Sequence, residues 1–275
     1  IKEIFFYDNS KTSYATENNL LALFFLVFLT LVLLDFLSIH LPSQKLDIYH
    51  EGQWLTPATN YLQKGGYWID SYMAIGLFHE ILSPIIGFKI FGIFSIGSSR
   101  FSVLLSILVF KIFLIIFIYK LTVIQKMNEN FKILFFVLIS LFALSMTSNF
   151  SAPEFLTANV GILSYRELPS IIFLILLIPI ISNEKMVIIY CFLIGIMSTI
   201  SMLWGIDRGL YLNLTLAFLI LFLIIKKDFR KSGWVIIGIV VGWTLFYTIV
   251  GPEEFKNFLY NTKNIYQSMN WLFGF

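Results

Sequence analysis

The chain is short of charge, of histidine and of cysteine. Charged residues make up 13% of its 275 residues, against roughly 25% in an average soluble domain. The single cysteine, Cys191, excludes a disulfide framework. A zinc site would need several ligands at suitable spacing, and the chain has three histidines in all. The net charge of +3 is spread over many loops and gives no sign of a nucleic-acid partner.

The motifs of nucleotide-dependent chemistry are also missing. The sequence contains no glycine-rich phosphate loop, no Cys-x-x-Cys pair, no Ser-His-Asp order and no dinucleotide fingerprint. A cytoplasmic enzyme that uses a nucleotide is therefore not indicated. If the chain is an enzyme, we expect its activated substrate to arrive through a membrane.

Apolar residues dominate instead. The hydrophobic fraction is 58% and there are thirty phenylalanines. Repeated apolar runs of about twenty residues are typical of membrane-spanning helices. We predict an all-α, polytopic membrane protein of about seven transmembrane helices, forming a single transmembrane domain over residues 1–275 as a fragment or a minimal protein. The expected spans are 20–37, 101–123, 131–148, 169–182, 186–204, 210–225 and 233–250.

A long, partly apolar loop over residues 38–100 separates the first two spans. Within it, the sequence predicts a short helix over 52–64 and an interfacial helix or helix pair over 72–94, lying on the membrane. An eighth span over 72–94 is the alternative, but a histidine, an acid, a proline and several glycines interrupt that segment. We expect His79 and Glu80 to mark the polar face of the interfacial helix.

Basic residues set the expected orientation. Four of them crowd the loop 226–232, which places that loop in the cytoplasm. Alternation of the spans then places the loop 38–100, the first outer loop, on the outside. We therefore expect an integral, multi-pass protein of a bacterial inner (cell) membrane, with its active face outside.

The first outer loop concentrates the polar candidates of the chain. Ionisable groups close to a membrane are candidate functional groups. Asp47 and Glu51 are four residues apart and share one face if that stretch is helical. A carboxylate there can act as a general base or hold a divalent cation; alternatively, both are solvated acids that complement a helix dipole. The other candidates of this loop are His50, Tyr67, Trp68 and Asp70.

Arginines stand beside acids at the outer ends of two later spans, as Arg166-Glu167 and Asp207-Arg208. One interpretation is a local ion pair that caps a helix. The other is capture of a lipid-linked phosphate, because a guanidinium binds phosphate oxygens in a bidentate manner. Arg100 either does the same or extends to the interface. We expect polar groups from the three outer loops to converge on one cavity.

The order of these residues resembles a known family. Asp47-x-x-His-Glu-Gly-x-x-Leu-x-Pro-Ala58 is followed by Gly65-Gly-Tyr-Trp-Ile-Asp70 and by Phe91-Gly-Ile-Phe-Ser-x-x-x-x-Arg100. Over roughly residues 20–125 this is similar to the polyprenyl-phosphate-sugar-dependent membrane glycosyltransferases of the C-type fold (GT-C), with protein mannosyltransferase and aminoarabinose transferase relatives. In that family the first outer loop carries the catalytic acid and two juxtamembrane helices.

The resemblance implies transfer of a sugar from a polyprenyl-phosphate donor to a lipid, glycan or protein acceptor. Asp47 matches the position of the catalytic acid, with Glu51 or Asp70 as its partner. Arg166 and Arg208 would neutralise the donor phosphate. No cofactor is required, and a divalent cation, held by Asp47 and Glu51, is compatible with this chemistry. Tyr67 and Trp68 would stack on a sugar or lie at headgroup depth.

Two other functions fit an oily chain with clustered charges. A lipid or polysaccharide transporter, or flippase, usually carries charges within its spans and has internal repeats. Here charges such as Asp35 and Lys111 are few within the spans, and no repeat is visible. A non-catalytic membrane scaffold would tolerate replacement of the acids in the first outer loop.

Overall fold

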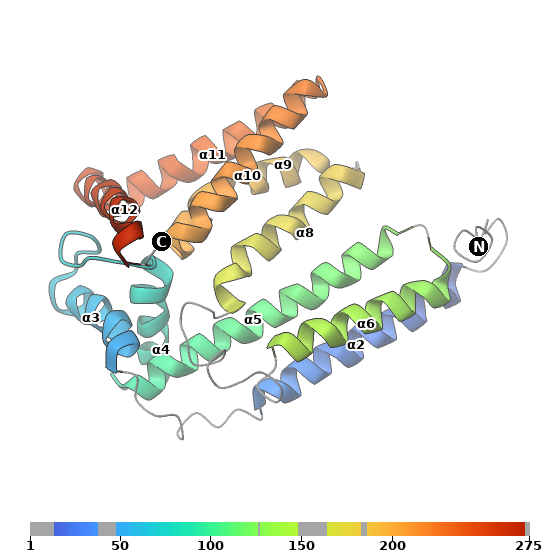
Figure 1. The fold of residues 1–275 in the computed structure, drawn as a ribbon, viewed down its shortest axis with the longest axis horizontal. Coiled ribbons are helices and arrows are strands. Elements are labelled where there is room, and N and C mark those ends of the chain that lie inside the picture. Colours follow the sequence, from blue (N-terminus) through green and yellow to red (C-terminus); the bar gives the residue numbers. More distant parts are fainter. Residues whose placement is uncertain (1–13, 38–47, 126, 148–163, 183–185, 273–275) are drawn as a thin grey trace. The chain divides into compact units, whose positions relative to one another are not determined.

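The computed structural model describes residues 14–37, 48–125, 127–147, 164–182 and 186–272, and every regular element in these ranges is a helix (Figure 1). This confirms the all-α class. The chain divides into two compact units, and each is described by itself. The first contains Ile1–His40 and Leu104–Ser182, and the second contains Leu41–Val103 and Asn183–Phe275.

The first unit is built from apolar helices around an aliphatic and aromatic core. Its helices are α2 (Tyr14–Leu37), most of α5 (Ile96–Val123), α6 (Glu129–Thr147), the 3-10 turn η4 (Ser164–Glu167) and α8 (Leu168–Ser182). Phe28 of α2 packs edge-on against Phe136 of α6, with 5.5 Å between the ring centroids. Ile115 and Ile118 of α5 complete this core.

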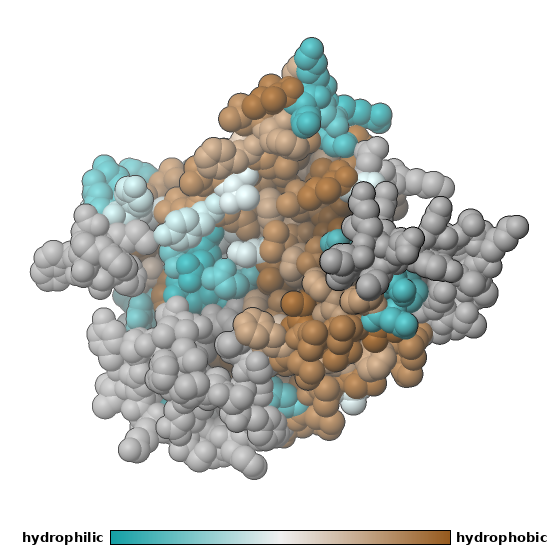
Figure 2. Space-filling view, turned by 45° about the vertical axis from the view of Figure 1, so that its right-hand side comes forward, coloured by the Kyte–Doolittle hydropathy of each residue, from teal (hydrophilic) through white to brown (hydrophobic). Residues whose placement is uncertain are grey.

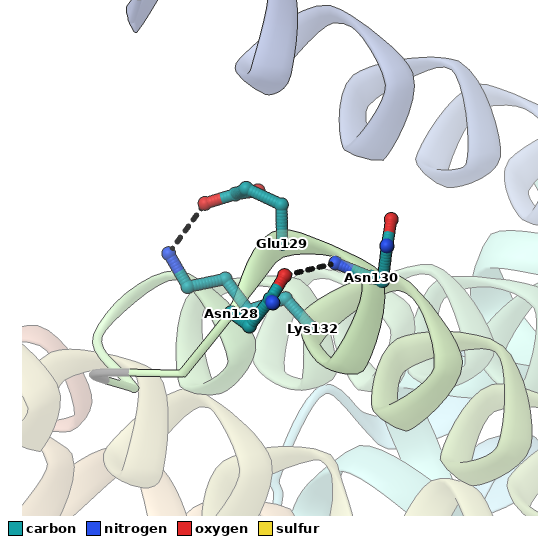
Figure 3. A network of polar contacts seen from close by, with 4 residues as sticks. All are labelled: Asn128, Glu129, Asn130 and Lys132. Atoms are coloured by element: carbon teal, nitrogen blue, oxygen red, sulfur yellow. Dashed lines mark hydrogen bonds and ion pairs between the residues drawn. The ribbon is translucent and has the colours of Figure 1, made fainter. Parts of the chain in front are cut away.

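The turn before α6 shows how a local polar sequence starts an apolar helix (Figure 3). The side-chain oxygen of Asn128 accepts a hydrogen bond from the backbone N–H of Asn130, at 3.1 Å. Lys132 Nζ pairs with Glu129 Oε1 at 2.9 Å. Capping by an asparagine and an acid in the first turn both stabilise a helix start.

Two charges within the expected spans of the first unit, Asp35 and Lys111, neutralise each other. Lys111 Nζ of α5 donates to Asp35 Oδ2 of α2, and the lysine side chain is 2% exposed. An isolated charge at such a depth is costly, whereas a paired and hydrogen-bonded one is tolerated.

The second unit combines three apolar helices of spanning length, α9, α10 and α11, with several other helices. Its helices are α3 (Ile48–Lys64), the π-helix η2 (Phe78–Leu82), α4 (Ser83–Phe91), α9 (Val187–Trp204), α10 (Ile206–Ile225), α11 (Phe229–Val250) and α12 (Pro252–Leu272). The helix predicted over 52–64 ends where expected but begins four residues earlier. The helix over 252–272 was not predicted.

Helices α9 and α11 touch through glycines. A Cβ atom on Gly195 would lie 2.1 Å from the carbonyl oxygen of Val235, and one on Gly238 would lie 2.1 Å from that of Phe192. Small residues at such crossings let two backbones approach closely, which is how helices pack in a membrane.

A polar network crosses the same bundle. Asn213 of α10 donates to the backbone oxygens of Ser198 and Gly209, at 3.0 and 2.8 Å. Trp243 Nε1 of α11 donates to Ser198 Oγ of α9, at 2.9 Å. One serine therefore ties three helices together, with the polar atoms paired as an apolar surrounding requires.

Five of the described helices are long and apolar enough to cross a membrane: Leu20–Leu37 within α2, then α5, α9, α10 and α11. The chain is accordingly a helical membrane protein. The other two expected spans fall on α6 and on α8, and α8 has only 15 residues, fewer than the about 20 that a bilayer core requires. The total of seven crossings stays a prediction.

The surfaces of these helices are apolar where they face outward. Leu214, Phe218 and Leu221 of α10 are more than half exposed. Hydrophobic surface covers the helix flanks visible in Figure 2, and the turn between α10 and α11 forms a hydrophilic tip at the top. Large exposed apolar surfaces mark contact with a membrane or a partner.

The other elements of the second unit gather at one end of the bundle of α9, α10 and α11. The backbone N–H of Ile206, at the start of α10, donates to the carbonyl oxygen of Ile75 at 2.8 Å. The ring of Phe78 stacks on Trp204 at the end of α9, with 3.7 Å between centroids. The basic turn 226–231 lies at the opposite end of α10, so the structure separates it from the first outer loop by the length of a span.

The segment 72–94 contains only η2 and α4, which follow each other without a break over five and nine residues. At 1.5 Å per residue these are too short to cross a bilayer core as one helix. The expected polar face is wrong, however. His79 and Glu80 are 3% and 1% exposed, because this turn packs against α3 and the loop before it instead of lying open on a surface.

Glycine substitutions test the helix crossing. We predict that Gly195→Ala and Gly238→Ala each lower the free energy of unfolding by about 1–3 kcal/mol or more, because the added methyl collides with backbone. Gly233→Ala is the matched control on α11, since nothing lies within 4 Å of its Cβ position, and it should stabilise by about 0.5–1 kcal/mol. Unfolding of the purified protein in detergent measures both. Equal effects of the three substitutions would contradict the close approach.

Thiol labelling tests the orientation. Gln63 and Arg230 are both exposed. The natural Cys191 is buried, so background labelling of this thiol is low. We predict that a membrane-impermeant maleimide labels Gln63→Cys in intact cells and labels Arg230→Cys only after the membrane is opened. Labelling of both in intact cells would exclude the arrangement.

Candidate functional site

A pocket of about 250 Å³ lies in the second unit between α3, the following loop and η2. This loop covers residues 65–76 and is called the 65–76 loop below. All the walls of the pocket belong to the first outer loop. Its lining residues are Gly52, Gln53, Thr56, Pro57 and Asn60 of α3, Asp70, Ser71, Tyr72 and Ala74 of the 65–76 loop, and Glu80 of η2.

The start of the 65–76 loop is held by a carboxylate of α12. Glu254 accepts hydrogen bonds from three successive backbone N–H groups: that of Tyr67 at 2.6 Å, that of Trp68 at 2.7 Å and that of Ile69 at 3.2 Å. Glu254 is 9% exposed. One side chain that accepts three successive backbone hydrogen bonds fixes a stretch that has no regular structure.

Two further side chains hold the rest of the loop. Asn261 of α12 accepts from the N–H of Met73 at 3.1 Å and donates to the carbonyl oxygen of the same residue at 2.9 Å. Glu80 accepts from the N–H groups of Ala74, Ile75 and Gly76, at 3.1, 2.9 and 3.0 Å. Seven backbone N–H groups of the loop thus donate to three side chains.

Asp70, one of the predicted catalytic acids, lines the pocket. Its Oδ2 accepts from the backbone N–H of Gly66 at 3.2 Å, and its carbonyl oxygen accepts from Asn60 Nδ2 at 3.2 Å. The residue is partly buried. These contacts orient a carboxylate at the pocket wall, where it can accept a proton or a hydrogen bond from a bound hydroxyl group.

Glu80 is a pocket-lining acid that sequence reasoning placed on a polar surface. Burial raises its pKa to about 7, while hydrogen bonds from three amides and from the Gln53 side chain act to lower it. It lies in the π-helix, an element often found at functional sites. The sequence signal for a buried polar site here was an acid next to a histidine, within an apolar segment that glycines interrupt.

Tyr67 and Trp68 lie in packed surroundings. Trp68 is 6% exposed and contacts the rings of Phe246 and Phe258 edge-on, at centroid distances of 5.7 and 5.2 Å. Tyr67 stacks on Tyr61 of α3, with their hydroxyl oxygens 3.3 Å apart. That hydrogen bond, with burial, raises the pKa of Tyr67 to about 12. Both rings therefore anchor the loop in the core of the second unit.

Asp207 and Arg208 begin α10 directly beside the first outer loop. Arg208 Nε lies 3.9 Å from Asp207 Oδ2, and the arginine side chain is 33% exposed. Because Ile206 bonds to Ile75, the loop between α9 and α10 meets the 65–76 loop. Two of the three predicted outer segments thus come together in the second unit.

The remaining candidates are located by the helices that carry them. Arg100 lies near the start of α5 in the second unit, and Arg166 is buried in η4 of the first unit. His50 and Glu51 lie in the first turn of α3, and Asp47 lies outside the described residues. Among the residues that the structure describes, no group of three or more His, Cys, Asp or Glu side chains is arranged to hold a metal ion.

Comparisons with protein-family models, with curated proteins and with solved structures found no match. Any function is therefore argued from the pocket, from the membrane helices and from the motif of the first outer loop.

The raised pKa of Glu80 gives a pH prediction. Its folded pKa of about 7 lies above the ordinary 4.5, so its contribution to stability is complete below about pH 4.5 and is lost as the pH rises through 7. We predict that the unfolding free energy of the wild type, minus that of Glu80→Gln, falls by about 3 kcal/mol between pH 4.5 and 8. Unfolding in detergent across this range measures it, with Glu253→Gln on α12 as the control for an exposed acid. A difference that stays constant with pH would contradict the prediction.

Proposed function

We propose that the chain is a membrane glycosyltransferase that moves a sugar from a polyprenyl-phosphate donor to a hydroxyl acceptor on the outer face. The observation that carries this proposal is the pocket in the first outer loop. It is lined by Asp70 and lies at one end of a bundle of membrane helices. That loop is also the one in which the GT-C resemblance sets the catalytic carboxylate.

The proposed reaction needs one base and one leaving group. A carboxylate of the first outer loop takes the proton of the acceptor hydroxyl, whose oxygen attacks the anomeric carbon in line. The bond from that carbon to the phosphate oxygen breaks, the polyprenyl phosphate leaves with the electron pair, and the configuration inverts. Asp47 is the first choice for the base and Glu51 the second, with Asp70 as the partner acid. General-base assistance typically contributes about 10²- to 10⁴-fold.

Arginines supply the counter-charge for the leaving phosphate. Arg208 lies beside the 65–76 loop and is partly exposed, so a lipid-linked phosphate that approaches from the membrane can reach it. Arg166 and Arg100 are proposed in the same role, because fixed cations stabilise charge that develops on a leaving phosphate. This division lets the membrane deliver the donor and the loop hold the acceptor.

The proposal includes the setting predicted from the sequence. It places about seven spans in a bacterial inner (cell) membrane, with the first outer loop outside and a lipid, glycan or protein as acceptor. No cofactor is required, and a divalent cation at Asp47 and Glu51 is compatible with the reaction.

The principal rival, a lipid or polysaccharide transporter, would depend on charges within the spans. The pair Asp35–Lys111 is such a feature, but its two side chains bond to each other and are buried. The pocket instead lies in the loop beyond the spans, which favours transfer chemistry over transport.

Carboxylate substitutions separate an enzyme from a scaffold. We predict that Asp47→Asn lowers the turnover of sugar transfer by about 10²- to 10⁴-fold, while the donor lipid still binds. Of Asp70→Asn and Glu51→Gln, the variant that loses more turnover identifies the partner acid. Arg208→Ala should weaken donor binding as well, because it removes a phosphate partner.

The assay is transfer of a labelled sugar from a polyprenyl-phosphate donor by the full chain in lipid vesicles. Glu253→Gln is the matched control, since it removes an exposed carboxylate on α12. Near-normal transfer by the single variants of Asp47, Glu51 and Asp70 would end the assignment of the base to this loop.

A further inference from the structure

Helix α12 supports the pocket without lining it. Its buried face is formed by Glu254, Phe258, Asn261 and Ile265, which are 9%, 1%, 4% and 4% exposed. Two of these four are polar, and both direct their side-chain atoms to the backbone of the 65–76 loop. Polar groups at such depth are costly unless fully bonded, so their presence points to a specific task.

That task is visible in the order of the contacts along the loop. Glu254 holds the N–H groups of residues 67–69, and Asn261 holds both the N–H and the carbonyl group of Met73. The three residues between these two anchor points, 70–72, all line the pocket. The pocket-lining stretch 70–72 is therefore suspended between two attachments that come from one helix.

The other attachments of the loop come from the first outer loop itself: Glu80 holds the N–H groups of residues 74–76, and Asn60 Nδ2 donates to the carbonyl oxygen of Asp70 at 3.2 Å. Residues 65–76 form no regular structure, and the backbone N–H groups of their buried and partly buried members must find acceptors. Trp68 adds packing against Phe258 of α12, which fixes the position of the loop. The direction of the chain at Asp70 depends on the hydrogen bonds on either side, together with the one from Asn60 to its carbonyl oxygen.

We propose that Glu254 and Asn261 are positioning residues of the transferase site, which set the place of Asp70 by holding the backbone on both sides of the stretch 70–72. This inference rests on the proposed function and extends it: α12 becomes a working part of the site. Neither residue touches the substrate. Their loss misplaces the carboxylate, and a misplacement of about 1 Å costs a reaction on the order of a hundredfold.

Matched substitutions on α12 test the proposal. Glu254→Ala and Asn261→Ala remove the two attachments. Glu253→Ala and Asn257→Ala are the controls on the same helix, because Glu253 is exposed and Asn257 donates to the backbone of α12 itself. Glu254→Gln keeps one acceptor oxygen, so its effects should lie between those of the wild type and those of Glu254→Ala.

The first readout is independent of activity. Hydrogen exchange of the backbone amides over 66–76, followed by mass spectrometry of the full chain in detergent, should accelerate in Glu254→Ala and Asn261→Ala. The expected factor is on the order of tenfold to a hundredfold for each lost bond to these acceptors. The two control variants should exchange like the wild type. Unchanged exchange in Glu254→Ala would overturn the proposal.

The second readout is kinetic. Sugar transfer should lose about a hundredfold in kcat in Glu254→Ala, with the KM for the donor little changed, because the phosphate partners remain in place. A general loss of folding would instead lower the amount of active protein and leave the kcat per active molecule unchanged. Faster exchange of the loop with normal kcat would also overturn the proposal.

The two proposals fail in different ways. If the wild type transfers no sugar, the proposed function fails, and the positioning role is then decided by exchange and by thiol labelling of Ser71→Cys in the pocket wall. Labelling of this thiol should speed up in the Glu254→Ala background and not in the Glu253→Ala background. Equal rates in both would reject the positioning role whatever the activity.

Discussion

The organisation of the second unit depends on one requirement: the backbone N–H groups of the 65–76 loop need acceptors. The loop forms no helix and no strand, so the acceptors come from side chains. Glu254, Asn261 and Glu80 supply them, with distances between 2.6 and 3.2 Å. Because the first two belong to α12 and the third to η2, this single requirement joins the first outer loop to the last described helix. The pocket, its acid Asp70 and the contact with the start of α10 all depend on it.

Much of the fold follows from the sequence, since apolar runs reveal spanning helices by composition alone. The runs 186–204 and 233–250 match α9 and α11 closely. Helix α12 was not predicted because it is amphipathic and contains no continuous apolar run. Phe255, Phe258 and Ile265 repeat at helical spacing between polar residues, and that period was the signal. His79 and Glu80 were placed on a surface because charge ordinarily indicates exposure, and no local pattern shows that loop amides will surround a carboxylate.

The candidate site was predictable in its region but not in its construction. The concentration of acids and aromatics identified the first outer loop, and Asp70 indeed lines a pocket there. The role of Glu254 was out of reach, since it acts on residues nearly two hundred positions away. Trp68 was expected at a sugar or a headgroup and is instead packed on α12 and α11; in the sequence alone, a buried aromatic pair and an interfacial one look the same. Side-chain partners distant in sequence are set by tertiary packing, which spacing does not encode.

The sequence separation between the 65–76 loop and Glu254, which holds its backbone, has a consequence for biosynthesis. Tyr67 and Glu254 are 187 residues apart. A ribosome that adds 5–20 residues per second therefore makes Glu254 about 10 to 40 s after Tyr67, whose N–H it accepts. During that interval the first half of the 65–76 loop has left the ribosome, but Glu254, which accepts its hydrogen bonds, has not yet been made. The intervening spans are still being inserted. The pocket is therefore among the last parts of the second unit to be completed, and premature termination before α12 would yield membrane helices with an unfinished site.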